Sequence, residues 1–316
     1  MTSPRVVALG GGHGLFATLT ALRSLTSQIT AIVTVADNGG SSGRLREEFP
    51  IFPPGDLRMA LAALCSDDEW GRSWAEIMQY RFTSDGPLDG HAVGNLLLAA
   101  LWDRDEDPVE GLDRVGALLK VVGRVLPMAG EPLDIEATFF EQGEKKTVRG
   151  QKEVATTTGR FDSVKLIPEN PKARPEALAA IAEADWITMG PGSWISSVLP
   201  HLLVPEQVDA LVNSPAKKIL LLNLDDAESG EFSGRSALDH IAAVQKLAPE
   251  LSFDFIVADS SLVSDPQAAK LLEDKVSTQG GELIVQDLRL PASANHHDTK
   301  KLASLFAHIA RKTLVG

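Results

Sequence analysis

Cysteine and long apolar runs are nearly absent from this chain. Its one cysteine, Cys65, excludes an intrachain disulfide, so nothing in the sequence indicates an oxidising compartment. Apolar runs such as residues 96–102 are too short to cross a bilayer. The first residues lead into a strand pattern without a charged and then apolar leader. These absences predict a cytoplasmic protein with no membrane segment.

Basic residues are also in deficit. The 30 lysines and arginines face 43 acidic residues, which gives a net charge of −13 and argues against a nucleic-acid or anionic-membrane partner. A small anionic ligand remains compatible, because helix ends and a few arginines decide its binding locally. The 44% share of apolar residues predicts a substantial core. We expect a single domain over residues 1–316, and this composition permits self-association.

Glycine, in contrast, is concentrated near the start. A β-branched strand over residues 5–9 stops at a glycine cluster, and a helix over residues 15–25 follows at once. A strand, a glycine turn and a helix together present free backbone N–H groups and a positive helix end, which suit a phosphate. The alternative is a tight connection with no ligand. The candidate binding residues here are Gly10, Gly11, Gly12, His13, Gly14 and Leu15.

A second polar, glycine-rich loop follows the next strand, over residues 29–36. Strand, helix and strand within about 30 residues form a βαβ unit of a parallel sheet, whose strands share a carboxyl edge. Open α/β sheets bind their ligands at that edge. The loop at residues 37–44 therefore joins the predicted site through Asp37, Asn38, Gly40, Ser41 and Ser42.

Two further segments supply candidates in the first half of the chain. The run at residues 53–58 contains Asp56, a candidate helix cap, and Arg58 in the first helical turn. The segment at residues 90–95 opens an apolar helix, on which His91 and Asn95 would share one face. No nucleophile partner for His91 is evident in the sequence.

The second half of the chain resumes the α/β pattern after a β-rich insertion at about residues 130–165, which contains a predicted hairpin. A strand at residues 186–189 ends in another glycine turn, with candidates Gly190, Pro191, Gly192 and Ser193. A strand at residues 218–223 ends at Asn223, a further candidate binding residue, and leads to a polar loop at residues 224–234. The predicted fold is a Rossmann-like α/β fold, with a mostly parallel sheet, helices on both faces and a small antiparallel insertion.

Several patterns allow more than one interpretation. The spacing Gly12-x-Gly14-x-x-Ala17, with Asp37 about 20 residues on, fits a short dinucleotide fingerprint. Asp37 and Asp56 would suit a magnesium ion, or serve as a turn residue and a helix cap. Arg44, Arg46 and Arg58 would either bind phosphate or lie in solvent. Residues 296–298 would form either a metal cluster or the cap of the last helix.

Taken in order, the motifs resemble those of the gluconeogenesis factor (YvcK-like) family, the bacterial branch of the CofD-like superfamily. The matching segments are residues 10–14, 35–44, 53–56, 79–82, 90–95 and 190–193, and they span nearly the whole chain. The enzyme branch of the superfamily carries an aspartate-rich motif where this chain has Pro53-Pro-Gly-Asp56, which favours the branch without an assigned reaction.

This resemblance implies a cytoplasmic regulator that binds a nucleotide sugar such as UDP-N-acetylglucosamine. It also implies a link between gluconeogenic growth, peptidoglycan synthesis and cell shape, with a cell-wall enzyme or regulatory protein as partner. On this hypothesis the glycine turns hold the diphosphate, and Asp37, Asn38, His91 and Asn95 contact the sugar or the nucleotide. The alternative hypothesis is a magnesium-dependent transferase that uses Asp37 and Asp56 on a nucleotide-diphosphate donor, as in the phospholactate transferase branch.

Overall fold

A central sheet of seven parallel strands organises the molecule. The computed structural model describes residues 3–105, 107–224, 235–291 and 293–315, and the polar loop predicted at residues 224–234 lies outside these residues except for Leu224. The strand order is β10-β9-β8-β7-β1-β2-β3. The sheet strands are β1 (Val6–Gly10), β2 (Ile29–Val33), β3 (Arg124–Pro127), β7 (Trp186–Met189), β8 (Lys217–Leu221), β9 (Phe255–Asp259) and β10 (Glu282–Gln286).

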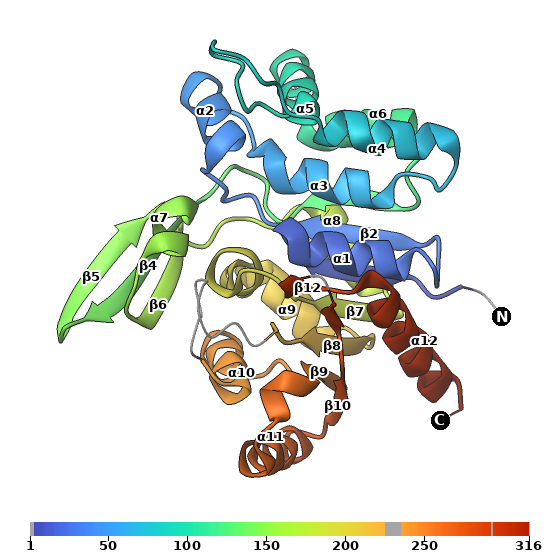
Figure 1. Ribbon diagram of the computed structural model, residues 1–316, viewed down its shortest axis with the longest axis vertical. Coiled ribbons are helices and arrows are strands. Elements are labelled where there is room, and N and C mark those ends of the chain that lie inside the picture. Colours follow the sequence, from blue (N-terminus) through green and yellow to red (C-terminus); the bar gives the residue numbers. More distant parts are fainter. Residues whose placement is uncertain (1–2, 106, 225–234, 292, 316) are drawn as a thin grey trace.

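The predicted Rossmann-like α/β fold is confirmed, with helices packed around the sheet (Figure 1). From β1 the chain adds strands toward β3, and from β7 it adds them the other way, toward β10. Because βαβ crossovers are right-handed, helices that connect strands in opposite directions cover opposite faces. Helix α1 (Gly12–Leu22) packs against α3 (Pro54–Leu64) and α12 (Thr299–Val315), whereas α9 (Pro205–Asn213) packs against α8 (Pro175–Glu183).

The remaining helices form two groups in the upper and lower parts of Figure 1. Above the sheet lie the segments between β2 and β3, and below it those that follow β8. No described helix is long and apolar enough to span a membrane. These helices are α2 (Gly40–Glu48), α4 (Glu69–Gln79), α5 (Val93–Arg104), α6 (Pro108–Leu119), α10 (Ala237–Leu247) and α11 (Pro266–Thr278).

The predicted antiparallel insertion is present, but it forms a sheet of its own. Strand β4 (Asp134–Glu141) pairs with β5 (Glu144–Arg149) and with β6 (Arg160–Ile167), and this sheet projects from the body (Figure 1). The short helix α7 (Gln151–Thr156) follows the hairpin. Residues 164–167, which the sequence also predicts as a strand, form the end of β6, whereas β3, the strand that closes the edge of the main sheet, is not predicted.

Three other boundaries differ from expectation. Residues 40–44 belong to helix α2 rather than to a loop, so a second helix begins at this edge of the sheet. After β7 the predicted helix is a π turn, η1 (Trp194–Val198), followed by a 3-10 helix, η2 (Leu199–Leu203). Residues 296–298, predicted as one cluster before α12, have separate roles. His296 and His297 belong to β12 (Ser293–His297), and Asp298 caps the helix by accepting hydrogen bonds from the N–H groups of Lys300 and Lys301.

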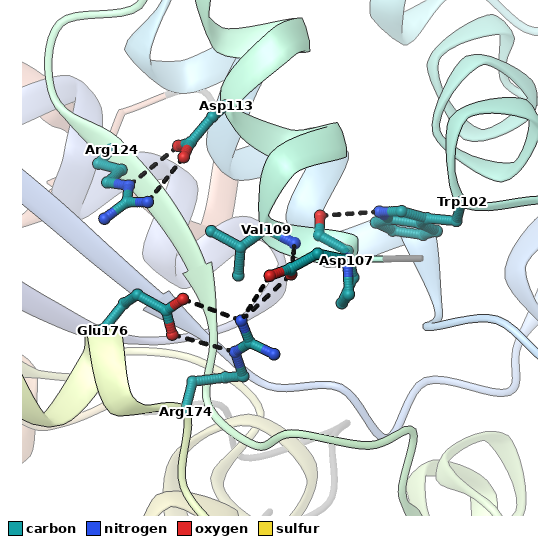
Figure 2. Close-up of polar contacts among 8 residues, drawn as sticks. Trp102, Asp107, Val109, Asp113, Arg124, Arg174 and Glu176 are labelled. Carbon is teal, nitrogen blue, oxygen red and sulfur yellow. Dashed lines mark hydrogen bonds and ion pairs between the residues drawn. The ribbon is translucent and has the colours of Figure 1, made fainter. Parts of the chain in front are cut away.

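An ion-pair network joins the upper helices to the second half of the chain. Arg174, just before α8, contacts Asp107 at the start of α6 and Glu176 in the first turn of α8 (Figure 2). Asp107 also accepts a hydrogen bond from the backbone N–H of Val109, which caps α6. The network thus fixes the direction in which two helices begin, near the carboxyl end of β3, because Ala173 bridges Ala129 just after that strand.

Candidate functional site

The candidate site lies where the strand order reverses. Strands β1 and β7 are neighbours at the centre of the sheet, yet the chain leaves them toward opposite faces. In open α/β sheets the crevice at such a switch point, at the carboxyl ends of the strands, is where ligands bind. Both strands end in glycine turns, residues 10–14 and 190–193.

The two glycine turns touch each other through their backbones. A Cβ at Gly14 would lie 2.1 Å from the carbonyl oxygen of Pro191 and 2.6 Å from the Cα of Gly192. No side chain fits at Gly14, and Gly12 adopts a left-handed φ of +56°. The turns predicted to share one edge are therefore in direct contact.

Asp56 faces the first turn from helix α3. A Cβ at Gly11 would lie 2.4 Å from Oδ2 of Asp56 and 2.5 Å from Oγ1 of Thr34, so these groups pack on the bare backbone. The Thr34 hydroxyl donates to Asp56 across 3.2 Å. Asp56 was expected to cap α3, but it lies inside the first turn and Pro53 occupies the cap position. Burial, followed by the neighbouring charge of Asp37, raises the pKa of Asp56 to about 7.

The segment after β2 is fixed to the start of α3. Asp37 accepts a hydrogen bond of 2.8 Å from the N–H of Gly39. The Ser42 hydroxyl accepts one of 3.0 Å from the N–H of Gly55. A Cβ at Gly55 would lie 2.8 Å from Oδ2 of Asp37, so the second carboxylate also packs against a glycine. Asp37 thus packs against the first turn of α3, which itself carries Asp56.

A buried polar relay joins three helices next to these carboxylates. Asn95 donates from Nδ2 to the Ser41 hydroxyl over 3.0 Å, and Ser41 lies 2.9 Å from Nδ1 of His91. Arg58 donates from Nε to Oδ1 of Asn95 over 2.8 Å. Because Ser41 accepts from Asn95, its own proton points to Nδ1 of His91, which places the imidazole proton on Nε2. Burial lowers the pKa of His91, which keeps the ring neutral.

The structure therefore supplies the partner that the sequence did not reveal for His91. His91 precedes α5 rather than lying on it, so the proposed helical face shared with Asn95 is wrong. The two side chains meet instead through Ser41, 50 residues earlier in the chain. Ser41, His91, Asn95 and Arg58 are all buried.

Arg58 retains an unused donor. Its side chain is 3% exposed, and its Nη1 has no hydrogen-bond partner among the residues that the structure describes. Burial lowers its pKa to about 10, so the guanidinium stays charged at neutral pH. A buried cationic donor without a partner is costly unless a ligand oxygen or water completes it.

The second half contributes mainly backbone. The N–H of Gly192 donates to Oδ1 of Asn223, which follows β8, over 3.0 Å. Ser193 is exposed. Beneath the first turn the buried His201 lies 3.3 Å from the carbonyl oxygen of Gly10, through its Nε2. Sequence reasoning missed His201 and Thr34; the polar end of the strand before Asp37 would have indicated Thr34, whereas nothing in the apolar run marks His201.

Four of the predicted residues have other roles. Leu15 is buried in the core and its N–H bonds to the carbonyl of Gly11, so it offers no group to a ligand. Asn38 faces the insertion, where it donates to Glu153 and accepts from the N–H of Lys152. The guanidinium groups of Arg44 and Arg46 bond to protein oxygens, chiefly backbone carbonyls, and do not point freely into the site.

His13 lies at the rim of the site. Its ring lies edge-on to that of His296, with centroids 6.0 Å apart. Burial, followed by His296 and Arg58, lowers the pKa of His13. Within the described part of the chain, no three histidine, cysteine or acidic side chains come together in a metal-binding arrangement. A cation bound by Asp37 and Asp56 would need further oxygen ligands, which a diphosphate supplies.

Comparison with known proteins places this site in a family. The family model of 2-phospho-L-lactate transferase CofD matches residues 6–296. A Mycobacterium tuberculosis relative, named as a gluconeogenesis factor, is 46% identical over 304 residues that cover 95% of this chain and 88% of its own. The gluconeogenesis factor of Bacillus subtilis is 35% identical and covers 98% of this chain and 99% of its own.

A solved structure shows the same architecture. The crystal structure of a UPF0052 family member from Bacillus halodurans superposes with a TM-score of 0.83 at 34% identity, over 97% of this chain and 99% of that one. The family model and these relatives extend across both glycine turns and the polar relay. The chain belongs to the CofD family, among the relatives named gluconeogenesis factors.

Proposed function

We propose that this chain binds a nucleotide-diphosphate sugar of the UDP-N-acetylglucosamine type at the switch point. In this proposal it is a cytoplasmic regulator that links gluconeogenic growth to peptidoglycan synthesis and cell shape. The observation that carries the proposal is the direct contact between the two glycine turns. The backbone N–H groups of both turns, which follow two neighbouring strands, would bind one diphosphate together with the N-terminus of α1.

The surrounding side chains suit such a ligand. Arg58 offers a buried cationic donor that lacks a partner, and a phosphate or sugar oxygen would complete it. The relay of Ser41, His91 and Asn95 holds the Arg58 side chain before the ligand binds. Arg58 would therefore lose little conformational entropy on binding. This side of the site would recognise the sugar or the base, and the glycine turns the diphosphate.

A transferase is the second candidate, because two carboxylates lie at the first turn of α3. Asp37 approaches the backbone of Gly55 and Asp56 that of Gly11, and with a bound diphosphate they would complete a magnesium site. In this alternative the diphosphate donor is consumed, whereas a regulator returns it intact. The ligand after incubation therefore separates the two functions.

The test is calorimetry of the full chain with UDP-N-acetylglucosamine, in the presence and absence of magnesium, followed by chromatography of the nucleotide. Binding with intact ligand supports the regulator, and loss of the sugar or formation of UDP supports the transferase. Heat with NAD and none with any UDP-sugar would overturn both proposals.

Ser193 offers a matched pair of variants, because its side chain is exposed. Ser193→Asp places a negative charge beside the diphosphate and is expected to weaken binding by about tenfold or more, or roughly 1.4 kcal/mol. The neutral Ser193→Asn has nearly the same shape and is expected to keep most of the affinity. Equal affinities for the two variants would mean that the ligand does not use the Gly190–Ser193 turn.

A further inference from the structure

A cavity of about 260 Å³ lies at the opposite end of the sheet from the glycine turns, where strand β3 begins. Helices α3 and α6 and the start of β3 line it, and none of the candidate site residues does. We propose that this cavity is a second binding site, for a small monoanionic molecule with an apolar body, such as an aromatic monocarboxylate.

The floor of the cavity is apolar. Leu61 of α3, Leu112 of α6 and Val125 of β3 line it, and each is almost fully buried. Gly116 and Gly123 also lie on its wall. An apolar ring or short chain would gain about 25 cal/mol for each Å² of surface that it buries here.

The rim carries charges, of which two neutralise each other. Arg124 binds Asp113 through Nε at 2.9 Å and Nη2 at 2.6 Å, in a bidentate pair (Figure 2). Such a pair presents little net charge to a ligand. The third charged residue on the rim, Lys120, forms no ion pair with any residue in the described ranges.

Lys120 is held at the mouth by its backbone and by an aromatic ring. It ends α6 in a left-handed conformation (φ 51°, ψ 47°), which glycine or asparagine adopts at lower cost. Its ammonium lies 5.6 Å from the ring centroid of Trp70. Trp70 in turn donates from its indole N–H to the carbonyl of Leu118 over 2.9 Å. The ammonium of Lys120, held beside a cavity with an apolar floor, is the feature that indicates a ligand with one negative charge.

The chemistry of the rim sets the class of ligand. A single free ammonium suits one negative charge, and the carboxylate of Asp113 disfavours a dianion. The volume lies just below the usual range of small-molecule sites, about 300–1,000 Å³, which excludes a nucleotide sugar. Leu61 lies five residues after Asp56 on α3, about 7.5 Å along the axis. A ligand in the cavity would therefore contact the helix that carries Asp56 and Arg58.

The experiment uses benzoate as the probe, with benzamide as its neutral counterpart, and follows binding to the full chain by NMR titration without nucleotide. We expect one benzoate per chain and about fivefold weaker binding of benzamide, the size of one exposed charge contact. Lys120→Asn keeps the left-handed preference and is expected to remove this difference. Lys275→Asn, on α11, is the matched control and is expected to change nothing.

A second variant tests the cavity itself. Ala117 is exposed on its wall, so Ala117→Phe fills the volume without disturbing the core and is expected to abolish binding of both probes. The proposal is overturned if benzoate does not bind, if benzamide binds equally well, or if either Lys120→Asn or Ala117→Phe leaves benzoate binding unchanged. Because no nucleotide is present, these outcomes are independent of the function proposed above.

Discussion

The two halves of the sheet contribute to the candidate site in different ways. The half built on β1, β2 and β3 supplies the polar side chains of Asp37, Asp56 and Arg58, and the relay holds Arg58 through Asn95. The half built on β7 to β10 supplies the backbone of residues 190–193 and the buried His201, which lies at the carbonyl of Gly10. The half built on β1, β2 and β3, which would contact the ligand through side chains, is the recognising half. The half built on β7 to β10, which contributes backbone and buried residues, is the supporting half. Four substitutions test that division, from the largest expected effect to the smallest.

The contact between the halves is tested at Gly14. Gly14→Ala drives Cβ into the backbone of Pro191, which cannot rotate away, so we expect a loss of about 3 kcal/mol or more in the free energy of unfolding. The control is Gly86→Ala, at an exposed glycine where a Cβ would only come into ordinary contact with Ser84, and it is expected to stay within about 0.5 kcal/mol. Urea unfolding measures both, and equal midpoints would show that the turns do not touch in solution.

The supporting half is tested by acid. Burial lowers the pKa of His201 from 6.5 to about 4, so its contribution is complete above pH 6.5 and is lost as the pH falls toward 4. This shift corresponds to about 3 kcal/mol of unfolding free energy. His201→Phe is expected to lower stability but to reduce its fall between pH 6.5 and 4. His308→Phe, at an exposed histidine, is expected to keep the fall; an unchanged slope in His201→Phe would contradict the assignment.

The recognising half has the opposite pH dependence at Asp56. Its folded pKa of about 7 lies above the ordinary value of 3.8, so this group favours the folded state less as the pH rises from 4 through 7. Asp56→Asn removes the buried charge and keeps an acceptor for Thr34. We expect a gain of about 1–2 kcal/mol at pH 8, and little at pH 4. The exposed Asp274→Asn is the control, and a loss of stability at pH 8 would show that the charge is compensated.

The smallest effect is expected where the recognising half meets the insertion. Asn38→Ala removes two hydrogen bonds to residues 152 and 153, at a cost of about 1 kcal/mol or less. We expect faster amide exchange in α7 with a nearly unchanged unfolding midpoint. Asn213→Ala removes a similar exposed bond far away and should leave α7 unchanged. Unaltered exchange in α7 for Asn38→Ala would mean that the insertion is held by other contacts.

The sequence predicts the repeated strands, the glycine turns and the hairpin, because each depends on local residue patterns. It fails where tertiary contacts override those patterns. Helix α2 begins with glycine and serine, which are poor helix formers, and the contact between Ser42 and Gly55 helps to hold it. Strand β3 has four residues and ends in proline, so its pattern is too short and too irregular to predict a strand.

The candidate site shows the same limit. The residues of both glycine turns were predicted, and the structure places these turns in contact. The bond between Ser41 and His91 joins positions 50 residues apart, and no spacing rule predicts it. His201 and the cavity at Lys120 were also missed, because a histidine in an apolar run and a helix end carry no pattern of their own.

The strand order also has a consequence for synthesis on the ribosome. Strand β1 is made first and pairs with β2 soon after, but its other neighbour, β7, begins only at Trp186. The 175 residues between Gly10 and Trp186 take roughly 9 to 35 seconds to translate at about 5–20 residues per second. During that interval β1, an interior strand of the finished sheet, is an open edge that is able to pair with another chain. Emergence of β7 is therefore the event that ends this exposure in the nascent protein.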